Sequence, residues 1–344
     1  MRLGIIGLPQ SGKATVFEAL TRTVAADGNP QESRIGTITV PDKRVDILSD
    51  MYTPRKTIYA QVAYFLPGKA DHAGGAKQEQ SIWTQVRDCD ALIHAVRNFS
   101  GYGVDAPTPK ADVAAIDQEL IISDLLVVEK RLERLALDER RGKKPNPEEI
   151  ALLNQCNAHL ENERPLRRFP EIATAKLLRG FAFLSAKPML MLFNNTDEDD
   201  ALPDAVSLPE GESCMVIRAK LEQELAQMSD DEAREFLVAF NIAASATDRV
   251  IQRSYDLMGL ISFFTVGEDE VRAWTIGRDT DAVEAAEVIH SDIKKGFIRA
   301  EVLAYDDLMD AGSYAEARKK GTVRLEGKTY KVVDGDIINF RFNV

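Results

Sequence analysis

The residues with the clearest chemical potential lie near the start of the chain, directly after the apolar run at residues 3–6. They form a glycine-rich loop that ends in a lysine, Gly7-Leu-Pro-Gln-Ser-Gly-Lys13. Glycines let successive backbone N–H groups turn toward phosphate oxygens, and the lysine of such a loop meets the β- and γ-phosphates. We expect the phosphate contacts to come from consecutive residues: Pro9, Gln10, Ser11, Gly12, Lys13, Ala14 and Thr15.

One position of this motif departs from its usual form. A serine or threonine normally follows the lysine and holds Mg²⁺ with its hydroxyl, whereas Ala14 follows Lys13 here and Thr15 comes one residue late. Mg²⁺ commonly keeps most of its waters and can be carried by the nucleotide itself. The sequence therefore predicts no metal ligand from the protein, with Mg²⁺ reaching the site only through the nucleotide phosphates.

Composition limits the class of protein. The chain has 344 residues, 44% hydrophobic and 28% charged, which is typical of about two soluble domains. A formal net charge of −12 argues against indiscriminate nucleic-acid binding, so any RNA contact is expected at a local basic patch, and no sequence-specific DNA binding is expected. No apolar stretch reaches the roughly 20 residues of a membrane span, which predicts a cytoplasmic protein without a membrane partner. The three cysteines are widely spaced and indicate neither a disulfide framework nor a zinc site.

The spacing of apolar residues predicts the helices and strands that position this loop. Residues 13–22 carry apolar side chains at helical spacing directly after the loop, as at the start of an α/β nucleotide-binding domain. Further apolar runs at residues 59–66, 91–96 and 189–193 predict buried strands of a mainly parallel sheet. Such strands alternate with helices that cover both faces of the sheet.

A helical hairpin is predicted between strands of this domain. Apolar residues recur at helical spacing over 116–137, and a second helix is signalled by Asn146 at its cap, Pro147 at its first position and Glu149. Basic residues cluster at the hairpin tip and after the second helix: Arg140, Arg141, Lys143, Lys144, Arg164, Arg167 and Arg168. They are consistent either with a solvated hairpin end or with a contact to RNA or a ribosome, and both interpretations stay open.

The pattern changes after residue 259. Short strands are expected at 262–265 and 271–276, then a helix over 281–295, then strands near 322–324, 328–332 and 337–342. This order is typical of a small β-grasp module.

Taken together, these features resemble the YchF family of Obg-related P-loop NTPases. The resemblance covers nearly the whole chain and is carried by these motifs: Gly7-Leu-Pro9, Val40-Pro-Asp42, Asp90-Ala-Leu-Ile-His-Ala-Val-Arg97, Val271-Arg-Ala-Trp-Thr-Ile276, Val288-Ile-His-Ser-Asp292, Lys295-Gly-Phe-Ile-Arg-Ala-Glu301 and the stretch from Asp334 to Val344. It implies an α/β P-loop NTPase fold, a parallel sheet with flanking helices, with an inserted coiled-coil hairpin and a carboxy-terminal β-grasp TGS domain. The expected division is 1–115 with 182–258 for the nucleotide-binding domain, 116–181 for the hairpin and 259–344 for the TGS domain.

The resemblance also implies where the base is bound. The family binds ATP in preference to GTP, and its base-reading motif of Asn, an apolar residue and Glu aligns with Asn194-Asn195-Thr-Asp197. An Asp in the last place is what guanine-binding relatives use, because a carboxylate accepts both N–H groups of one guanine edge. Glu198 would restore a family-like carboxylate under a one-residue shift, so ATP and GTP both stay open. The backbone around Ala219 aligns with a further base-contacting loop.

Departures from the family cluster where hydrolysis would be carried out. The family's first-switch Thr aligns with Pro30, and its second-switch Asp aligns with Phe65. Together with Ala14, these are three positions at which the side chain lacks the oxygen that would hold Mg²⁺. The loop at 99–105, which carries a catalytic His in the family, has none, and His72 is the one histidine of the second-switch region. We assign no catalytic residue, and the sequence leaves open whether the protein is an enzyme.

Three functions remain. The first is a purine-nucleotide-binding regulator associated with translation or the ribosome, with weak or lost hydrolysis. The second is an RNA- or ribosome-binding adaptor that contacts its partner through the hairpin and TGS domain and uses the nucleotide domain as a scaffold. The third is a slow, Mg²⁺-dependent ATPase or GTPase.

Overall fold

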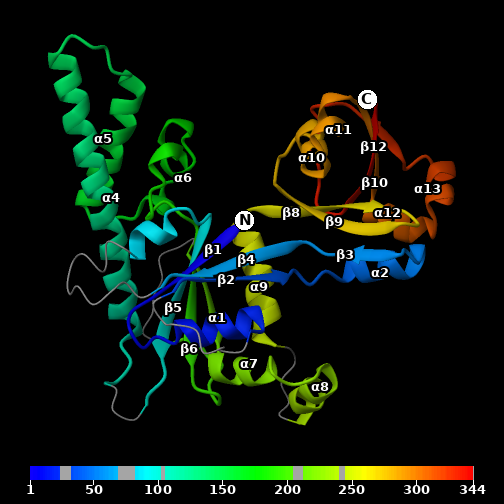
Figure 1. The fold of residues 1–344 in the computed structure, drawn as a ribbon, viewed down its shortest axis with the longest axis horizontal. Helices are drawn as coiled ribbons and strands as arrows, with labels where there is room; N and C mark the ends of the chain where they lie inside the picture. The colour runs from blue at the N-terminus through cyan, green and yellow to red at the C-terminus, as the bar shows by residue number, and fades with distance from the viewer. Residues whose placement is uncertain (24–31, 69–81, 102–104, 204–211, 240–244, 344) are drawn as a thin grey trace. The chain divides into compact units, whose positions relative to one another are not determined.

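The computed structural model describes residues 1–23, 32–68, 82–101, 105–203, 212–239 and 245–343 (Figure 1). The chain forms two compact units. Unit 1 comprises residues 1–37 and 63–250, and unit 2 comprises residues 38–62 and 251–344. The structure thus groups residues 38–62 with the carboxy-terminal residues, whereas the division expected from the sequence assigns them to the nucleotide-binding domain.

Unit 1 is built on a six-stranded sheet in the order β2-β4-β1-β5-β6-β7. Its strands are β1 (Arg2–Ile6), β2 (Arg34–Thr39), β4 (Gln61–Leu66), β5 (Ala91–Asn98), β6 (Met189–Asn195) and β7 (Ser213–Ile217). The pairs from β4 through β1, β5 and β6 to β7 are parallel. Every residue of β6 is buried, because helices cover both faces of a parallel sheet. The predicted α/β fold with a parallel sheet is confirmed.

The helices of unit 1 surround this sheet and form the hairpin. They are α1 (Lys13–Thr21), α4 (Pro109–Arg140), α5 (Pro147–Glu161), α6 (Pro170–Ala173), α7 (Ala219–Leu225) and α8 (Asp230–Ala239), with 3₁₀ turns η1 (Leu166–Arg168) and η2 (Lys176–Phe181). The helix α9 (Ala246–Leu257) begins in unit 1 and continues into unit 2, which resumes at residue 251. Figure 1 shows α4 and α5 side by side as the hairpin. As predicted, α5 starts at Pro147, and Asn146 Oδ1 accepts from Glu148 N at 3.0 Å. None of the helices in the described residues is long and apolar enough to cross a bilayer.

Buried ion pairs and hydrogen bonds fix the base of the hairpin to the sheet. Asp124 of α4 accepts from the amides of Leu184 at 2.9 Å and Ser185 at 2.7 Å, just before β6. Arg167 of η1 donates from Nη2 to Asp117 at 2.8 Å and from Nε to Glu212 at 3.1 Å, and its side chain is 5% exposed. Arg167 is therefore a structural anchor, which removes it from the basic residues that could contact RNA.

His94 is an unusual member of the buried β5. It is 1% exposed, and neither ring nitrogen has a hydrogen-bond partner in the described residues. Burial, together with the positive charges of Arg167 and Lys13, lowers the pKa of His94 to about 3. In the folded protein the ring consequently stays neutral at pH values near and well below the ordinary histidine pKa of about 6.5.

We expect this histidine to make folding sensitive to acid. The unfolded chain binds a proton at His94 near the ordinary pKa of about 6.5, so stability is lost as the pH falls from about 6.5 toward 3, by about 2 kcal/mol at pH 5. Urea denaturation of the protein and of His94→Leu at each pH measures the difference. The Leu variant should show a flatter pH profile between about pH 7 and 5. Parallel profiles for the two proteins would contradict the prediction.

Unit 2 is built on a second six-stranded sheet, in the order β11-β10-β12-β8-β9-β3. Its strands are β3 (Lys56–Ile58), β8 (Leu260–Val266), β9 (Glu270–Gly277), β10 (Phe297–Ala304), β11 (Arg324–Glu326) and β12 (Asp336–Phe342). Its helices are α2 (Lys43–Tyr52), α10 (Ala282–Ile289), α11 (Ser291–Lys295), α12 (Tyr305–Ala311) and α13 (Tyr314–Lys320). β12 runs parallel to β8 and antiparallel to β10, which gives the β-grasp arrangement.

Several predicted elements of unit 2 differ in the structure. The helix expected over 281–295 is divided at His290, whose Nδ1 accepts from Asp292 N at 3.2 Å and caps α11. The strand expected at 328–332 is wrong, because that segment pairs only through an isolated bridge between Lys331 and Asp281. The strand expected at 322–324 lies at 324–326.

Arg44 explains why the segment containing α2 belongs to unit 2. Its guanidinium contacts Asp42 at 2.8 Å and Asp334 at 2.7 Å, and it lies 5.1 Å from the ring centre of Phe264. Asp334 in turn accepts from Ser262 N at 2.9 Å. Two motifs that carry the family resemblance, Val40-Pro-Asp42 and the start of the stretch at Asp334, thus meet at one arginine.

Candidate nucleotide-binding site

The glycine-rich loop follows β1 and packs tightly against its neighbours. Gly7 has φ of 150°, and a Cβ placed on it would lie 2.4 Å from the carbonyl oxygen of Ala95. Gly12 has φ of 86°, and its Cβ would lie 2.3 Å from Asn194 Nδ2. Only glycine fits these positions, so the loop can bring its backbone amides close to a ligand.

The start of α1 supplies the positive end of a helix at this loop. Gly12 is the N-cap residue, and no side chain of the described residues caps the helix. The first amides of an α-helix have no acceptor within the helix and point outward along its axis. Together with the helix dipole they form an anion site, so the backbone here fits a phosphate group.

Lys13 lies across the loop. Its Nζ donates to the carbonyl oxygens of Gly7 and Leu8, each at 2.7 Å. The ammonium group is therefore held beside the loop, where it would meet a bound phosphate. These residues fit a nucleotide phosphate chain, in which Lys13 would exchange carbonyl oxygens for phosphate oxygens.

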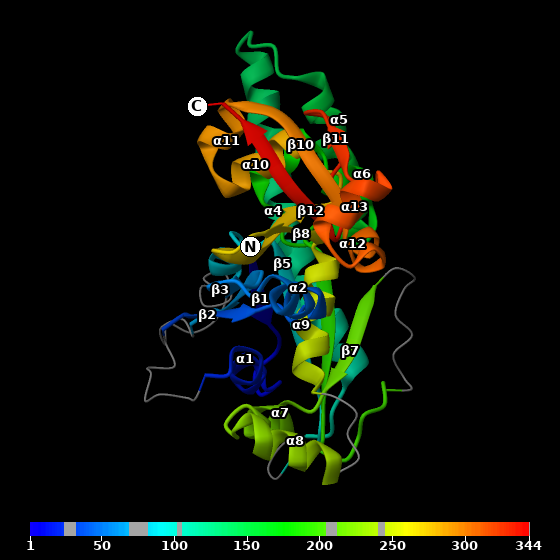
Figure 2. The same cartoon turned by 90° about the vertical axis from the view of Figure 1, so that its right-hand side faces the viewer.

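Asn194 connects the loop to the second part of the site. It is 4% exposed at the end of β6, where its Nδ2 donates to Ser11 O at 3.2 Å and its Oδ1 accepts from Ala219 N at 3.1 Å. α1 and α7 lie side by side in Figures 1 and 2, consistent with this bridge. Each amide atom of Asn194 keeps capacity for one further hydrogen bond. The structure thus brings the loop, Asn194 and Ala219 together.

Asn195 and Asp197 lie at the same edge of the sheet but differ in environment. The buried Asn195 accepts from Asn98 Nδ2 at 2.9 Å and donates to Ala201 O at 2.8 Å, so its side chain faces the protein interior. Asp197 is exposed, and its carbonyl oxygen accepts from Arg218 at 3.2 Å. Of the two side chains, that of Asp197 is available to a ligand.

The expected metal-binding positions are apolar where the structure describes them. Phe65 is 6% exposed in the hydrophobic core, and Ala14 is exposed at the start of α1. No group of three or more His, Cys, Asp or Glu residues that could hold a metal is found in the described ranges. Pro30 and His72 lie outside the described residues, as do residues 102–104 of the loop at 99–105.

Glu18 is a supporting residue that the sequence did not single out. It is 6% exposed in α1, accepts from both Arg34 Nη1 at 3.0 Å and Nη2 at 2.9 Å, and accepts from Gln223 at 2.5 Å. It thus ties α1 to β2 and α7. The sequence signal that could have indicated this role is the presence of a charged residue inside the apolar run Val16-Phe17-Glu18-Ala19-Leu20.

Comparisons with known proteins agree along the whole chain. A family model described as "YchF-GTPase_C: Protein of unknown function (DUF933)" matches residues 260–343. The "Ribosome-binding ATPase YchF" of Bacillus subtilis (strain 168) is 36% identical over 365 residues, covering 99% of each chain. The protein of the same name in Escherichia coli O157:H7 is 33% identical over 363 residues, covering 100% of this chain and 99% of the relative.

Solved structures agree with this assignment. The Schizosaccharomyces pombe YchF GTPase matches with a TM-score of 0.84 and 28% identity, covering 99% of this chain and 97% of that chain. The GTP binding protein from Pyrococcus horikoshii OT3 matches with a TM-score of 0.61 at 18% identity, which supports the fold alone. The resemblance seen in the sequence is confirmed, and this chain belongs to the YchF family.

Proposed function

We propose that this protein is a purine-nucleotide-binding regulator that associates with the ribosome and hydrolyses nucleotide weakly or not at all. The observation that carries the nucleotide part is the convergence of the uncapped helix start, Lys13 and Asn194 on one loop. The relatives named "Ribosome-binding ATPase YchF" support the ribosome partner, the nucleotide and a location in the cytoplasm.

The residues divide the binding work between phosphate and base. The backbone of residues 9–15 and Lys13 hold the phosphates, while Asn194 and Asp197 contact the purine. Asp197 would accept from the N–H groups of guanine, whereas the names of the relatives favour ATP. Both nucleotides therefore belong in the test.

Weak hydrolysis follows from the missing oxygen ligands. Phosphoryl transfer depends on positioning and on stabilising charge, with little covalent chemistry from the protein. Loss of one preorganised electrostatic contact costs about 3 kcal/mol, roughly a hundredfold in rate. Neither Ala14 nor the buried Phe65 has a side-chain oxygen that could contact Mg²⁺, so Mg²⁺ would reach the site only on the nucleotide phosphates.

Restoring a hydroxyl at position 14 should restore dependence on Mg²⁺. Ala14 is exposed directly after Lys13, so a threonine there has room for its side chain. We expect Mg²⁺ to raise the nucleotide affinity of Ala14→Thr about tenfold, equivalent to about 1.4 kcal/mol, and to change that of the parent protein little. Titrations with Mg²⁺ and with EDTA measure the ratio. Ala14→Val has the same shape without the hydroxyl, and an equal response from it would count against the hydroxyl as the cause.

Calorimetry with ATP and GTP, each with and without Mg²⁺, tests the proposal most directly. Binding of at least one nucleotide in both conditions, with phosphate release no faster than for Lys13→Ala, is the expected result. Absence of binding for both nucleotides would end the proposal. Mg²⁺-dependent phosphate release well above that of Lys13→Ala would instead establish the ATPase or GTPase alternative.

An adaptor that uses its nucleotide domain as a scaffold is the second candidate. Arg140, Arg141 and Lys144 are exposed at the tip of the hairpin and are suited to contact ribosomal RNA. Ribosome co-sedimentation of Lys13→Ala separates the two candidates. Association that persists in this variant and ignores added nucleotide favours the adaptor, whereas association that responds to nucleotide only in the parent protein favours the regulator.

A further inference from the structure

The backbone N–H of Gly68 lies at the edge of the sheet where the phosphate loop begins. β4 pairs with β1 in parallel register, with Phe65 opposite Gly4. Three residues beyond this pair, the two segments reach Gly68 and Gly7, so both glycines leave the sheet at the same edge. The carboxyl edge of a parallel sheet is where such folds bind their ligands. Gly68 is therefore placed, and buried, next to the start of the loop.

This N–H is occupied by a side chain. It donates to Gln85 Oε1 at 3.1 Å. Gln85 belongs to a short helical stretch, residues 82–86. Trp83 of this stretch and Leu8 of the loop pack in one hydrophobic cluster, so the stretch lies against the loop. A neutral amide oxygen thus holds a donor that would otherwise be free for an anion.

The place of this donor selects one phosphate of a bound nucleotide. A phosphate loop cradles the α- and β-phosphates with its own amides. The N–H of Gly68 comes from the neighbouring strand, so it is left for the terminal phosphate, which extends beyond the loop. A charged acceptor forms a stronger hydrogen bond than the neutral amide of Gln85 does. A triphosphate can therefore take this N–H from Gln85, whereas a diphosphate leaves the bond intact.

A second contact connects the same stretch of chain to the hairpin. Arg87, two residues after Gln85, donates from Nη2 to Ser123 Oγ of α4 at 2.8 Å and from Nη1 to Ala182 O at 3.3 Å. Its Nη1 lies 3.6 Å from Oδ1 of Asp124, the carboxylate that fixes the base of the hairpin to the sheet. A change at Gln85 consequently reaches α4 through only two residues.

We propose that Gln85 is a positioning residue that responds to the terminal phosphate of the nucleotide. In the ligand-free protein it holds the N–H of Gly68. A triphosphate displaces it from this bond, and the released stretch changes the contacts of Arg87 at the base of the hairpin. This inference rests on the proposed nucleotide site and adds the group that distinguishes a triphosphate from a diphosphate there.

Affinities for triphosphates and diphosphates in two variants of the full chain test this role. Gln85→Met keeps the length of the side chain but has no oxygen to hold the N–H of Gly68. We expect calorimetry to show about a threefold to tenfold rise in affinity for ATP or GTP, and no change for ADP or GDP. Gln85→Glu holds the N–H more strongly and should shift this ratio in the opposite direction. A residue that only supported the fold would lower both affinities together.

Gln155→Met is the matched control, because Gln155 is exposed on α5. It should leave the affinities for triphosphate and diphosphate at their parental values. The same ratio of the two affinities in the parent, Gln85→Met and Gln85→Glu would overturn the inference and leave the nucleotide site standing. Absence of binding of all four nucleotides to the parent protein would overturn the site and the inference together.

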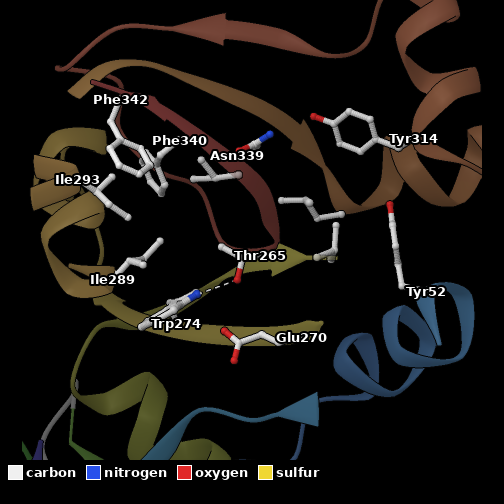
Figure 3. Close-up of a pocket in the computed structure, with 13 residues that line it drawn as sticks. Tyr52, Thr265, Glu270, Trp274, Ile289, Ile293, Tyr314, Asn339, Phe340 and Phe342 are labelled. Atoms are coloured by element: carbon white, nitrogen blue, oxygen red, sulfur yellow. Dashed lines mark hydrogen bonds between the residues drawn. The ribbon is translucent and has the colours of Figure 1, made fainter. Parts of the chain in front are cut away.

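Trp83 reports on the same event, because it lies two residues before Gln85. The other tryptophan of the chain, Trp274, belongs to unit 2, where its Nε1 donates to Thr265 Oγ1 at 3.0 Å (Figure 3). In a Trp274→Phe background, the emission of Trp83 should change with triphosphate and not with diphosphate, and Gln85→Met should remove most of this difference. Amide hydrogen exchange of residues 120–126 should follow the same pattern. Identical emission with both nucleotides would contradict the role of Gln85, and identical exchange would contradict its link to the hairpin.

Discussion

Replacing Lys13 with alanine should lower the affinity for ATP or GTP at least about a hundredfold, equivalent to roughly 3 kcal/mol. The ammonium group lies against the loop carbonyls of Gly7 and Leu8, so it is already placed beside the phosphate position. Hydrogen bonds to a charged group contribute about 1.5–3 kcal/mol each, and the variant loses every one that Lys13 would make to phosphate. The backbone amides of the loop and helix remain, which leaves weak residual binding.

Calorimetry under identical salt conditions measures this loss. Lys110→Ala provides a matched control, because Lys110 is exposed in α4 and its removal changes the net charge by the same amount. The control should retain parental affinity, and both variants should keep the parental unfolding midpoint in urea. An unchanged affinity in Lys13→Ala would show that the loop does not hold the phosphates.

Replacing Arg167 with methionine should destabilise unit 1 by about 3 kcal/mol, because two buried carboxylates then keep only the outer contacts of Arg168, at 4.0 Å to Asp117 and 3.2 Å to Glu212. The Arg167 side chain is 5% exposed, and its partners Asp117 and Glu212 are 13% and 6% exposed. Methionine fills a similar volume but cannot neutralise the two carboxylates. The free energy of unfolding should fall accordingly, with the hairpin base and the start of β7 losing protection first.

Urea denaturation followed by circular dichroism gives the loss in stability, and amide hydrogen exchange locates it. Arg164→Met is the control, since Arg164 is exposed in the same segment and its substitution should change stability by no more than about 0.5 kcal/mol. Adding Asp117→Asn and Glu212→Gln to Arg167→Met should recover part of the loss. Equal destabilisation by both arginine substitutions would argue against the buried pairs as the cause.

The parallel sheet of unit 1 could be predicted because its strands are continuous apolar runs. β5 and β6 are buried along almost their whole length, and their apolar runs stand out although β5 contains His94 and β6 ends in two asparagines. The start of α5 was equally clear, since Asn146 and Pro147 act locally and need no distant partner. Signals of this kind are contained within a few residues of sequence.

Elements that depend on distant partners were not predictable. β10 lies inside the second sheet, yet it contains the buried Glu301, which pairs with Arg318 and Arg341. A glutamate in a strand argues against burial until its arginines are known to converge on it. β3 spans only Lys56–Ile58 and is stabilised by pairing with β9, a strand more than 200 residues later.

The candidate site likewise combines a part that local sequence predicts with a part that depends on contacts between distant segments. The loop from Gly7 to Lys13 is a local motif, and its geometry follows from its glycines. The bridge from Ser11 through Asn194 to Ala219 joins three separate segments, and only the family resemblance indicated that they meet. That Asn195 faces inward while Asp197 faces solvent depends on the contacts of Asn195 with Asn98 and Ala201.

The membership of residues 38–62 in unit 2 bears on how the protein can be dissected. A fragment beginning at residue 259 would leave behind α2 and β3, and with them Arg44 and Tyr52. Asp334 would lose its cation, and the edge of β9 would lose its neighbouring strand. The carboxy-terminal residues alone are therefore not an independent domain, because the amino-terminal segment 38–62 completes their fold, and a fragment that represents unit 2 has to include that segment.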